Sequence, residues 1–159
     1  MSTIATSTAL HRPVGSGAMY WGPGDLYTFL VTGEESGGAY FAMEALVPPG
    51  GGPPPPIHRN EDETFYVVEG TCTFRLGDTT VLAGPGDYVH VPRGTVHNFH
   101  NGGTGTARLV LTFTPSGIER FFEETLHRAI DPTMDPPESP AIVAARYAEA
   151  APRYGIEFL

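Results

Sequence analysis

Two glycine-bounded segments of the sequence contain the side chains best suited to chemistry. The first segment contains His58 and Glu63, and the second contains His97. Each histidine comes at the edge of a strand-like run. Successive side chains of a strand point to opposite faces, so His97 shares a face with Phe99, and Glu63 shares one with Phe65. If the aromatic side of these strands is the core, Glu63 and His97 both point inward.

A carboxylate at position 63 would then need a positively charged partner. Burying an ionised carboxylate is costly unless it is paired, and the sequence contains no lysine. A metal ion is the simplest partner, although an arginine would also serve. We therefore predict a divalent metal ion beside Glu63 and His97, which are also the candidate catalytic residues.

The elements that must position these residues are short strands separated by turns. Gly and Pro are abundant, at 20 and 16 residues, and they lie between short apolar runs. Such spacing predicts an all-β sandwich or barrel, for which a jelly-roll barrel is a common solution. The expected strands are residues 26–32, 39–47, 64–68, 72–76, 79–82, 88–91, 96–100 and 107–114.

The pattern changes to a helical one near the C-terminus. Ser116-Gly117-Ile118-Glu119 has the form of a capping box, with Ser116 as the N-cap of a first helix. Ser139 followed by Pro140 begins a second helix, which runs to about Ala150. Their apolar faces must cover the end of the barrel or contact a second subunit. We predict a flexible N-terminal arm (1–18), a barrel (19–115) and a helical tail (116–159).

Composition excludes several classes of function. The net charge is −9 and all nine basic residues are arginine, so nucleic acid is a poor partner, and Schiff-base or Walker-type lysine chemistry is impossible. Cys72 is the only cysteine and suits a core position, which rules out an internal disulfide. The sequence lacks an apolar run of membrane-spanning length, and Met1–Leu10 lacks the features of a signal peptide. We expect a cytoplasmic protein without a membrane partner.

The two segments resemble the two sequence motifs of the cupin superfamily. The second segment matches its motif at every fixed position, namely Gly86, Pro92, Gly94, His97 and Asn101. The first segment matches its motif at Gly50, His58, Glu63 and Gly70. The chain after about residue 20 is similar to small single-domain bacterial cupins that are themselves similar to quercetin dioxygenase.

This resemblance implies an RmlC-like jelly-roll barrel with two C-terminal helices, and by analogy a homodimer. It also implies a metal set of three histidines and one glutamate, but Pro56 stands where the first histidine should be. The implied metal set is thereby reduced to His58, Glu63 and His97. Two histidines and one carboxylate bind Fe(II) in oxygenases, and three protein ligands plus water are typical of catalytic zinc. A register in which His58 is the first histidine and Asn60 the second leaves only two residues before Glu63 and is the less favoured alternative.

The resemblance leads to one main functional expectation and two alternatives. The main one is a metal-dependent, dioxygenase-like enzyme acting on an aromatic or polyketide-like small molecule, with Fe, Mn, Ni, Co or Zn. One alternative is a non-redox isomerase or cyclase that needs no metal and uses Glu63 and His97 as acid and base. The other is a non-catalytic barrel that binds a metabolite.

The remaining polar residues near the motifs have simpler interpretations. His100 alternates with His97 and should face the opposite side of its strand. By the alternation of its strand His90 could line the cavity, but we favour a structural role for it. We expect Glu61 and Asp62 to lie in a solvated turn, with the nearby arginines forming surface ion pairs.

Overall fold

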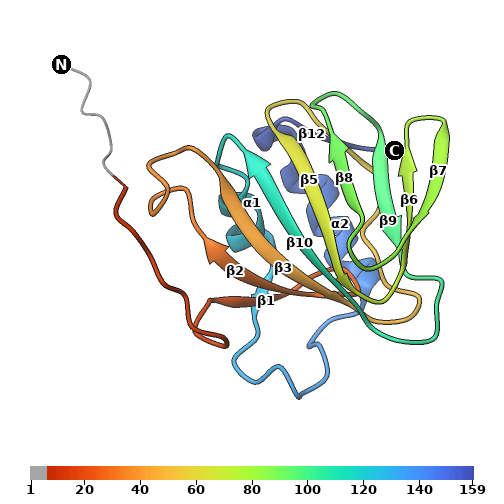
Figure 1. Ribbon diagram of the computed structural model, residues 1–159, viewed down its shortest axis with the longest axis horizontal. Helices are drawn as coiled ribbons and strands as arrows, with labels where there is room; N and C mark the ends of the chain where they lie inside the picture. The colour runs from red at the N-terminus through yellow and green to blue at the C-terminus, as the bar shows by residue number, and fades with distance from the viewer. Residues whose placement is uncertain (1–6) are drawn as a thin grey trace.

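The computed structural model describes residues 7–159, which form two β layers and a helical tail. The larger layer is an antiparallel sheet with the strand order β11-β1-β2-β3-β10-β5-β8 (Figure 1). Its strands are β1 Met19–Trp21, β2 Leu26–Val31, β3 Phe41–Val47, β5 Asp62–Glu69, β8 Tyr88–Val91, β10 Ala107–Thr114 and β11 His127–Arg128. In the central strand β10, buried and partly exposed residues alternate, so one face of the sheet forms the core.

The second layer faces this sheet and completes an all-β jelly-roll barrel. It consists of a three-stranded sheet, β7-β6-β9, and a two-stranded sheet, β12-β4. Its strands are β4 Pro56–His58, β6 Cys72–Leu76, β7 Thr79–Ala83, β9 His97–His100 and β12 Ile156–Phe158. Cys72 is fully buried between the layers, and burial raises the pKa of its thiol to about 11. The predicted fold class is therefore confirmed.

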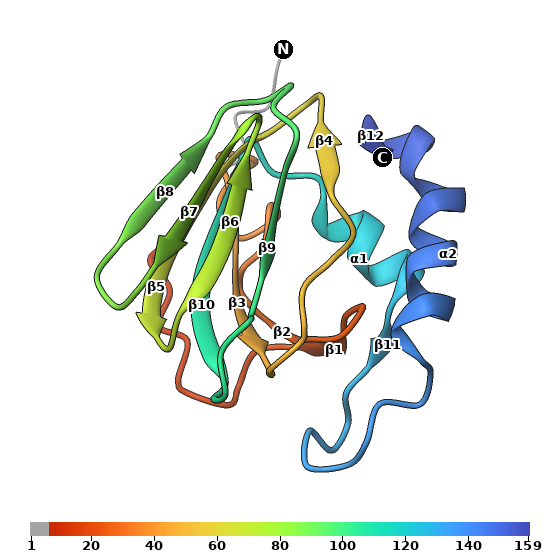
Figure 2. The same ribbon diagram turned by 90° about the vertical axis from the view of Figure 1, so that its right-hand side faces the viewer.

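The C-terminal tail closes the open side of the barrel. Helices α1 (Glu119–Thr125) and α2 (Pro140–Ala150) lie beside β4 on this side, as Figure 2 shows. Phe121, Phe122 and Tyr147 on the inner faces of the helices are buried in the same core as the strands. The helices thus form a wall of the barrel interior.

A short 3-10 helix, η1 (Ala151–Tyr154), follows α2 and leads into β12. Gly155 makes the turn between them with a φ of +67°, a conformation that favours glycine. A Cβ atom at this position would also lie 2.5 Å from the side chain of Asn60. This tight turn allows β12 to pair with β4, so that Ile156 lies opposite His58.

The start of α1 differs from the sequence prediction. The helix begins at Glu119, its N-cap is Ile118, and no side chain caps it, so the assignment of Ser116 as N-cap was wrong. The Glu119 carboxylate instead accepts hydrogen bonds from the backbone N–H groups of Gly33 and Gly117, each at 2.7 Å. A tertiary contact with the loop after β2 therefore replaces the local cap.

Residues 7–18 precede the barrel without a helix or strand of their own up to position 18. Arg12 attaches this segment to the barrel, because its Nε donates to the Leu30 carbonyl at 3.1 Å and its guanidinium pairs with Glu35. The first six residues of the predicted arm lie outside the described part of the chain. Within residues 7–159, no helix is both long enough and apolar enough to span a membrane.

Candidate metal centre

The structure brings His58, Glu63 and His97 together inside the barrel. They come from three strands, β4, β5 and β9, and one potential ligand atom from each lies within 4.8 Å of those of the other two. All three side chains are buried, with exposed fractions of 7%, 4% and 3%. Glu63 faces inward because β5 alternates, which places it on the same face as Phe65.

The Glu63 carboxylate lies between the two imidazole rings. Its Oε2 atom is 2.7 Å from His97 Nε2 and 3.3 Å from His58 Nε2. The ring centroids of the two histidines are 5.2 Å apart. Three donor atoms from separate strands are therefore directed toward a common point.

The backbone near His97 fixes which of its ring nitrogens carries a proton. His97 Nδ1 lies 2.9 Å from the Thr95 carbonyl oxygen, which can only accept a hydrogen bond, so Nδ1 is the donor. In a neutral ring, Nε2 would then present a lone pair to a carboxylate that is also an acceptor. A proton or a cation must lie between these two atoms.

The pKa values follow from this arrangement. Burial alone would raise the pKa of Glu63, but the adjacent His97 and His58 lower it to about 2. Burial likewise opposes the charged form of His97, but Glu63 and the Thr95 carbonyl raise its pKa overall. Glu63 is therefore an anion over the whole physiological pH range.

These residues fit a divalent metal. Two imidazole nitrogens and one carboxylate oxygen form a donor set suited to Fe, Ni, Co and Zn. The bond from His97 Nδ1 to a backbone carbonyl is the contact that commonly orients a metal-binding histidine. His58 lacks that support, because its buried Nδ1 has no hydrogen-bond partner among residues 7–159.

The three residues line a small, mostly apolar cavity. Its volume is about 40 Å³, which is room for about three water molecules. Most of the wall is aromatic, and no arginine among residues 7–159 contributes to it. Of the lining residues, Pro53, Asn98 and Phe158 are partly exposed and form the rim. A larger ligand must displace part of this rim to enter.

Comparison with known proteins agrees with this architecture. Residues 43–113 match the family model described as the cupin domain. The chain contains a cupin domain. This cupin is 27% identical to quercetin 2,3-dioxygenase of Bacillus subtilis over 97 residues, which are 61% of the chain but only 28% of that longer relative.

Solved structures show the same fold. A polyketide cyclase from Streptomyces resistomycificus is 26% identical, with a TM-score of 0.56 over 69% of this cupin and 80% of the cyclase. An RmlC-like cupin from Shewanella frigidimarina is 19% identical, with a TM-score of 0.59 over 72% of this cupin and 99% of that chain. At 19% identity, the similarity to the RmlC-like cupin shows the fold alone.

Pro56 occupies the position in the cupin barrel where the motif places its first histidine. It lies two residues before His58 on β4, and both side chains are buried and line the cavity. The proline therefore stands on the ligand-bearing side but offers no donor atom. Asn60, the second histidine position in the other register, is exposed and donates to the Tyr154 carbonyl, away from the cavity.

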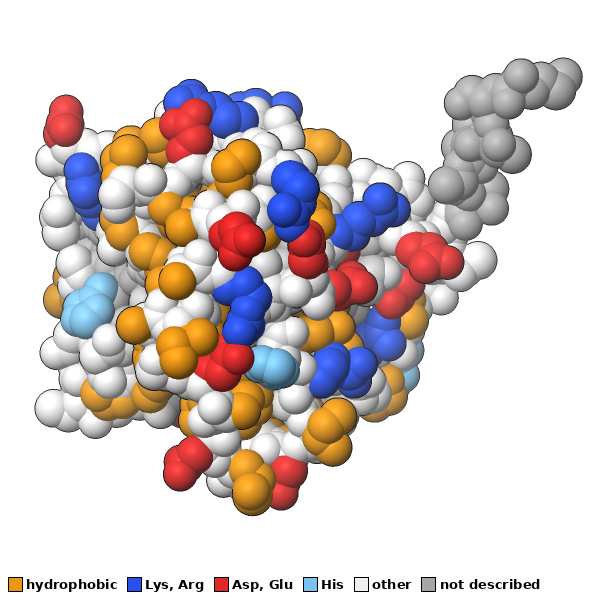
Figure 3. Space-filling model, turned by 180° about the vertical axis from the view of Figure 1, so that it is seen from behind, with side chains coloured by type: hydrophobic (Ala, Val, Ile, Leu, Met, Phe, Trp, Pro, Cys, Tyr) orange, Lys and Arg blue, Asp and Glu red, His pale blue; other side chains and the backbone are white. Residues whose placement is uncertain are grey.

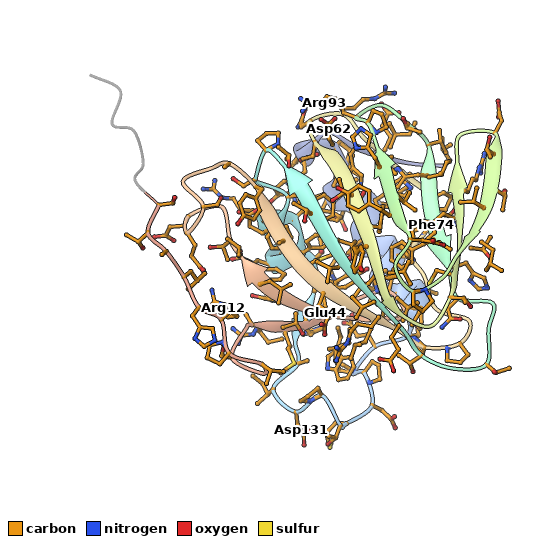
Figure 4. All side chains as sticks on the ribbon, viewed as in Figure 1. Arg12, Glu44, Asp62, Phe74, Arg93 and Asp131 are labelled. Atoms are coloured by element: carbon orange, nitrogen blue, oxygen red, sulfur yellow. The ribbon has the colours of Figure 1, made fainter. Side chains whose placement is uncertain are left out.

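Other polar residues of the cupin motifs lie outside the centre. His90 and His100 are both exposed and contribute nothing to the cavity wall. Arg93 pairs with Asp62 at 3.1 Å on the surface, and Figure 4 shows these two side chains together at one end of the barrel. Glu61 does not lie in a solvated turn as predicted. It directly precedes β5 and is only 5% exposed, so it is buried like Glu63 two residues later.

Sequence reasoning missed a second group of polar residues in the cupin barrel, Asp25, Tyr27 and Tyr147. Tyr27 and Tyr147 line the same cavity as the candidate ligands. The sequence did indicate that Tyr27 is buried, because it lies two residues before Phe29 in β2 and therefore points to the same face of the strand. Tyr147 lies one helical turn after buried Val143, but the sequence did not indicate which surface that turn would cover.

Proposed function

We propose that this protein is a metal-dependent enzyme that oxidises a small aromatic or polyketide-like molecule, with a divalent ion held by His58, Glu63 and His97. The observation that carries the proposal is the convergence of three buried donor atoms within 4.8 Å at the wall of an aromatic cavity. Fe, Mn, Ni, Co or Zn would supply Lewis acidity and, if redox-active, electron exchange between the substrate and dioxygen.

The protein's own groups have distinct tasks in this proposal. His58 and His97 provide neutral nitrogens, and Glu63 provides the negative charge. With the ion bound, the Glu63 carboxylate would also accept a proton from a substrate hydroxyl. The aromatic walls bind the ring of the substrate and exclude water.

The lining also favours a neutral substrate over a dianion. No arginine among residues 7–159 reaches the cavity, and the chain has no lysine, so a second substrate carboxylate would find no protein cation. The activities named for two relatives, oxidation of quercetin and cyclisation of a polyketide, are consistent with an oxygenated, ring-containing substrate.

Two observations favour a second candidate, a non-redox isomerase or cyclase. Pro56 removes one potential ligand and so weakens metal binding, and the pair of Glu63 Oε2 and His97 Nε2 at 2.7 Å is suited to proton transfer. In this case the same cavity would bind the substrate, and Glu63 and His97 would act as base and acid without a metal.

The metal content of the protein tests the main proposal. Protein purified without chelator and reconstituted with each of the five metals should retain about one equivalent of at least one metal. The variants His58→Ala and Glu63→Gln should lose it, whereas His90→Ala and His100→Ala, which change exposed histidines, should keep it.

Retention of less than about a tenth of an equivalent of every metal would overturn this proposal. Turnover that is equal in metal-free and metal-loaded protein, but is lost in Glu63→Gln, would establish the non-redox alternative. Metal binding that survives both His58→Ala and Glu63→Gln would show that the ion binds elsewhere.

A further inference from the structure

The short connection between β4 and β5 contains two buried polar atoms without partners. One is the Nδ1 atom of His58 and the other is the Oε2 atom of Glu61, and neither has a hydrogen-bond partner among residues 7–159. The two residues are only 7% and 5% exposed. Buried polar groups are rarely left unpaired in folded proteins, so two such atoms in one connection call for an explanation.

This connection separates its buried residues from its exposed ones. Arg59 and Asn60, in the middle, are exposed and bind the segment that leads into β12, which lies beside β4 (Figure 2). Arg59 pairs with Glu157 at 3.1 Å, and Asn60 donates to a backbone carbonyl of η1 at 3.2 Å. His58 and Glu61, at the two ends of the connection, are both buried. The contacts of the middle residues thus hold the two ends in place.

The carboxylate of Glu61 interacts electrostatically with His58. Burial raises the pKa of Glu61, and among the groups that oppose this effect the His58 imidazole is the strongest, ahead of the Arg93 guanidinium. Because a Coulomb interaction weakens with distance, this order indicates that the His58 ring is the closer of the two to the carboxylate. A hydrogen bond between them requires no change of charge, since an ionised carboxylate is already an acceptor.

His97 shows what such a hydrogen bond does. Its Nδ1 donates to the Thr95 carbonyl, and its Nε2 therefore faces Glu63 Oε2 at 2.7 Å. His58 Nε2 faces the same oxygen at 3.3 Å, but no group among residues 7–159 is bonded to its Nδ1. Metal-binding histidines usually donate their second N–H to a carboxylate or a carbonyl, which fixes the tautomer and the orientation of the ring. Glu61 is the buried carboxylate that can do this for His58.

We propose that Glu61 is a positioning residue for His58, whose Nδ1–H donates to the Glu61 carboxylate either directly or through one bridging water. This bond keeps a proton on Nδ1 and leaves Nε2 free to bind a cation. The inference deepens the proposed function and rests on it only in taking His58 as a metal ligand. Because Pro56 provides no donor atom, the orientation of each remaining ligand has a larger effect on the affinity for metal.

Two substitutions separate the acceptor from the space that it fills. Glu61→Gln keeps an oxygen acceptor of the same shape, whereas Glu61→Met has a similar volume and no comparable acceptor. Asp62→Asn is the control, because it changes the neighbouring acidic residue, which pairs with Arg93 on the surface. All three variants are made in the full chain, and circular dichroism checks that each one folds.

Nitrogen-15 NMR of the imidazole rings tests the hydrogen bond in metal-free protein. In the wild type, His58 Nδ1 should carry a proton. This proton should remain in Glu61→Gln and in Asp62→Asn. In Glu61→Met it should move to Nε2, where Glu63 is the remaining acceptor. This measurement involves neither a metal nor turnover.

Zinc affinity, measured by competition with a chelator, tests the consequence for the metal centre. Glu61→Met should bind zinc about 10–100-fold more weakly than the wild type, which is the usual effect of removing such a partner. Glu61→Gln should remain within about threefold of the wild type because it keeps the acceptor. Asp62→Asn should leave the affinity unchanged.

An unprotonated His58 Nδ1 in the wild type would overturn the inference, and this result needs no variant. Equal zinc affinities in the wild type and Glu61→Met would also overturn it, as would equal losses in the Gln and Met variants. If the wild type binds no zinc, a proton on Nδ1 that is lost only in Glu61→Met would keep the Glu61 contact and refute the metal-dependent function alone.

Discussion

At the scale of single residues, one proline determines how many ligands the candidate metal centre has. Pro56 and His58 are next-but-one neighbours on β4, so their side chains point to the same side, and both line the cavity. A side chain with a nitrogen donor at position 56 would therefore face the existing ligands. The incomplete ligand set is a property of one side chain and not of the barrel.

Replacing this residue tests the ligand geometry directly. We expect Pro56→His to bind divalent metal at least about tenfold more tightly than the wild type, a gain of ~1.4 kcal/mol. Competition with a chelator of known affinity measures the change. Pro55→His is the control, because Pro55 does not line the cavity and should leave the affinity unchanged. Equal affinities in all three proteins would show that position 56 does not face the ion.

At the scale of elements, α1 depends on a single carboxylate. Glu119 is 7% exposed and accepts two backbone hydrogen bonds, one of them from Gly33 in the loop after β2. It therefore joins the first turn of the helix to the large sheet. Phe121 and Phe122, which line the cavity, follow directly and take their places from this attachment.

Glu119→Ala should accordingly destabilise the fold by about 2–4 kcal/mol, since it leaves two backbone N–H groups without their acceptor. Urea denaturation followed by circular dichroism measures the free energy of unfolding. Glu123→Ala removes an exposed glutamate from the same helix and should change it by less than about 0.5 kcal/mol. Similar losses in the two variants would mean that the Glu119 contacts add little.

The elements also show what the sequence predicts and what it does not. The longer strands and α2 were predicted closely, because alternation and the Ser139-Pro140 signal are local properties. The short strands β4 and β12 were missed, because three residues contain too little periodicity. They exist through their pairing with each other across about 100 positions of sequence, with Pro56 opposite Phe158.

The same distinction applies to the site. Strand alternation predicted that Glu63 and His97 point inward, and the resemblance to the cupin motifs added His58. The structure brings the three together. The two tyrosines of the cavity wall, Tyr27 and Tyr147, were not predicted in this way. Tyr147 reaches the cavity only because α2 covers the open side of the barrel, which is a tertiary arrangement.

At the scale of the whole molecule, charge and burial together affect stability. Acidic and basic side chains are interspersed over the back of the molecule, as Figure 3 shows. Exposed pairs of this kind contribute little, about 0–1 kcal/mol each. Buried Asp25 has a larger effect, because burial raises its pKa from 3.8 to about 7. The folded state therefore favours the protonated carboxyl. The free energy of unfolding falls as the pH rises from about 4 to 7, because the unfolded chain ionises this group more readily.

Asp25→Asn should prevent this loss of stability at higher pH, because the amide is similar in shape and does not ionise. We expect the variant to exceed the wild type in unfolding free energy by about 1 kcal/mol at pH 4.5 and by about 4 kcal/mol at pH 8. Chemical denaturation at a series of pH values measures the difference. Asp78→Asn, a change at an exposed aspartate, should show no such trend. A gap that stays constant with pH would contradict the assignment.

The lone thiol has a practical consequence for studying motion. Because Cys72 is fully buried and burial raises its pKa to about 11, maleimide and methanethiosulfonate labels should not reach it in the native protein. Cysteines introduced at exposed Ile142 on α2 and Leu82 on β7 would then be the only labelled sites. Spin-label distances between them would reveal whether the tail swings outward when the narrow interior admits a ring.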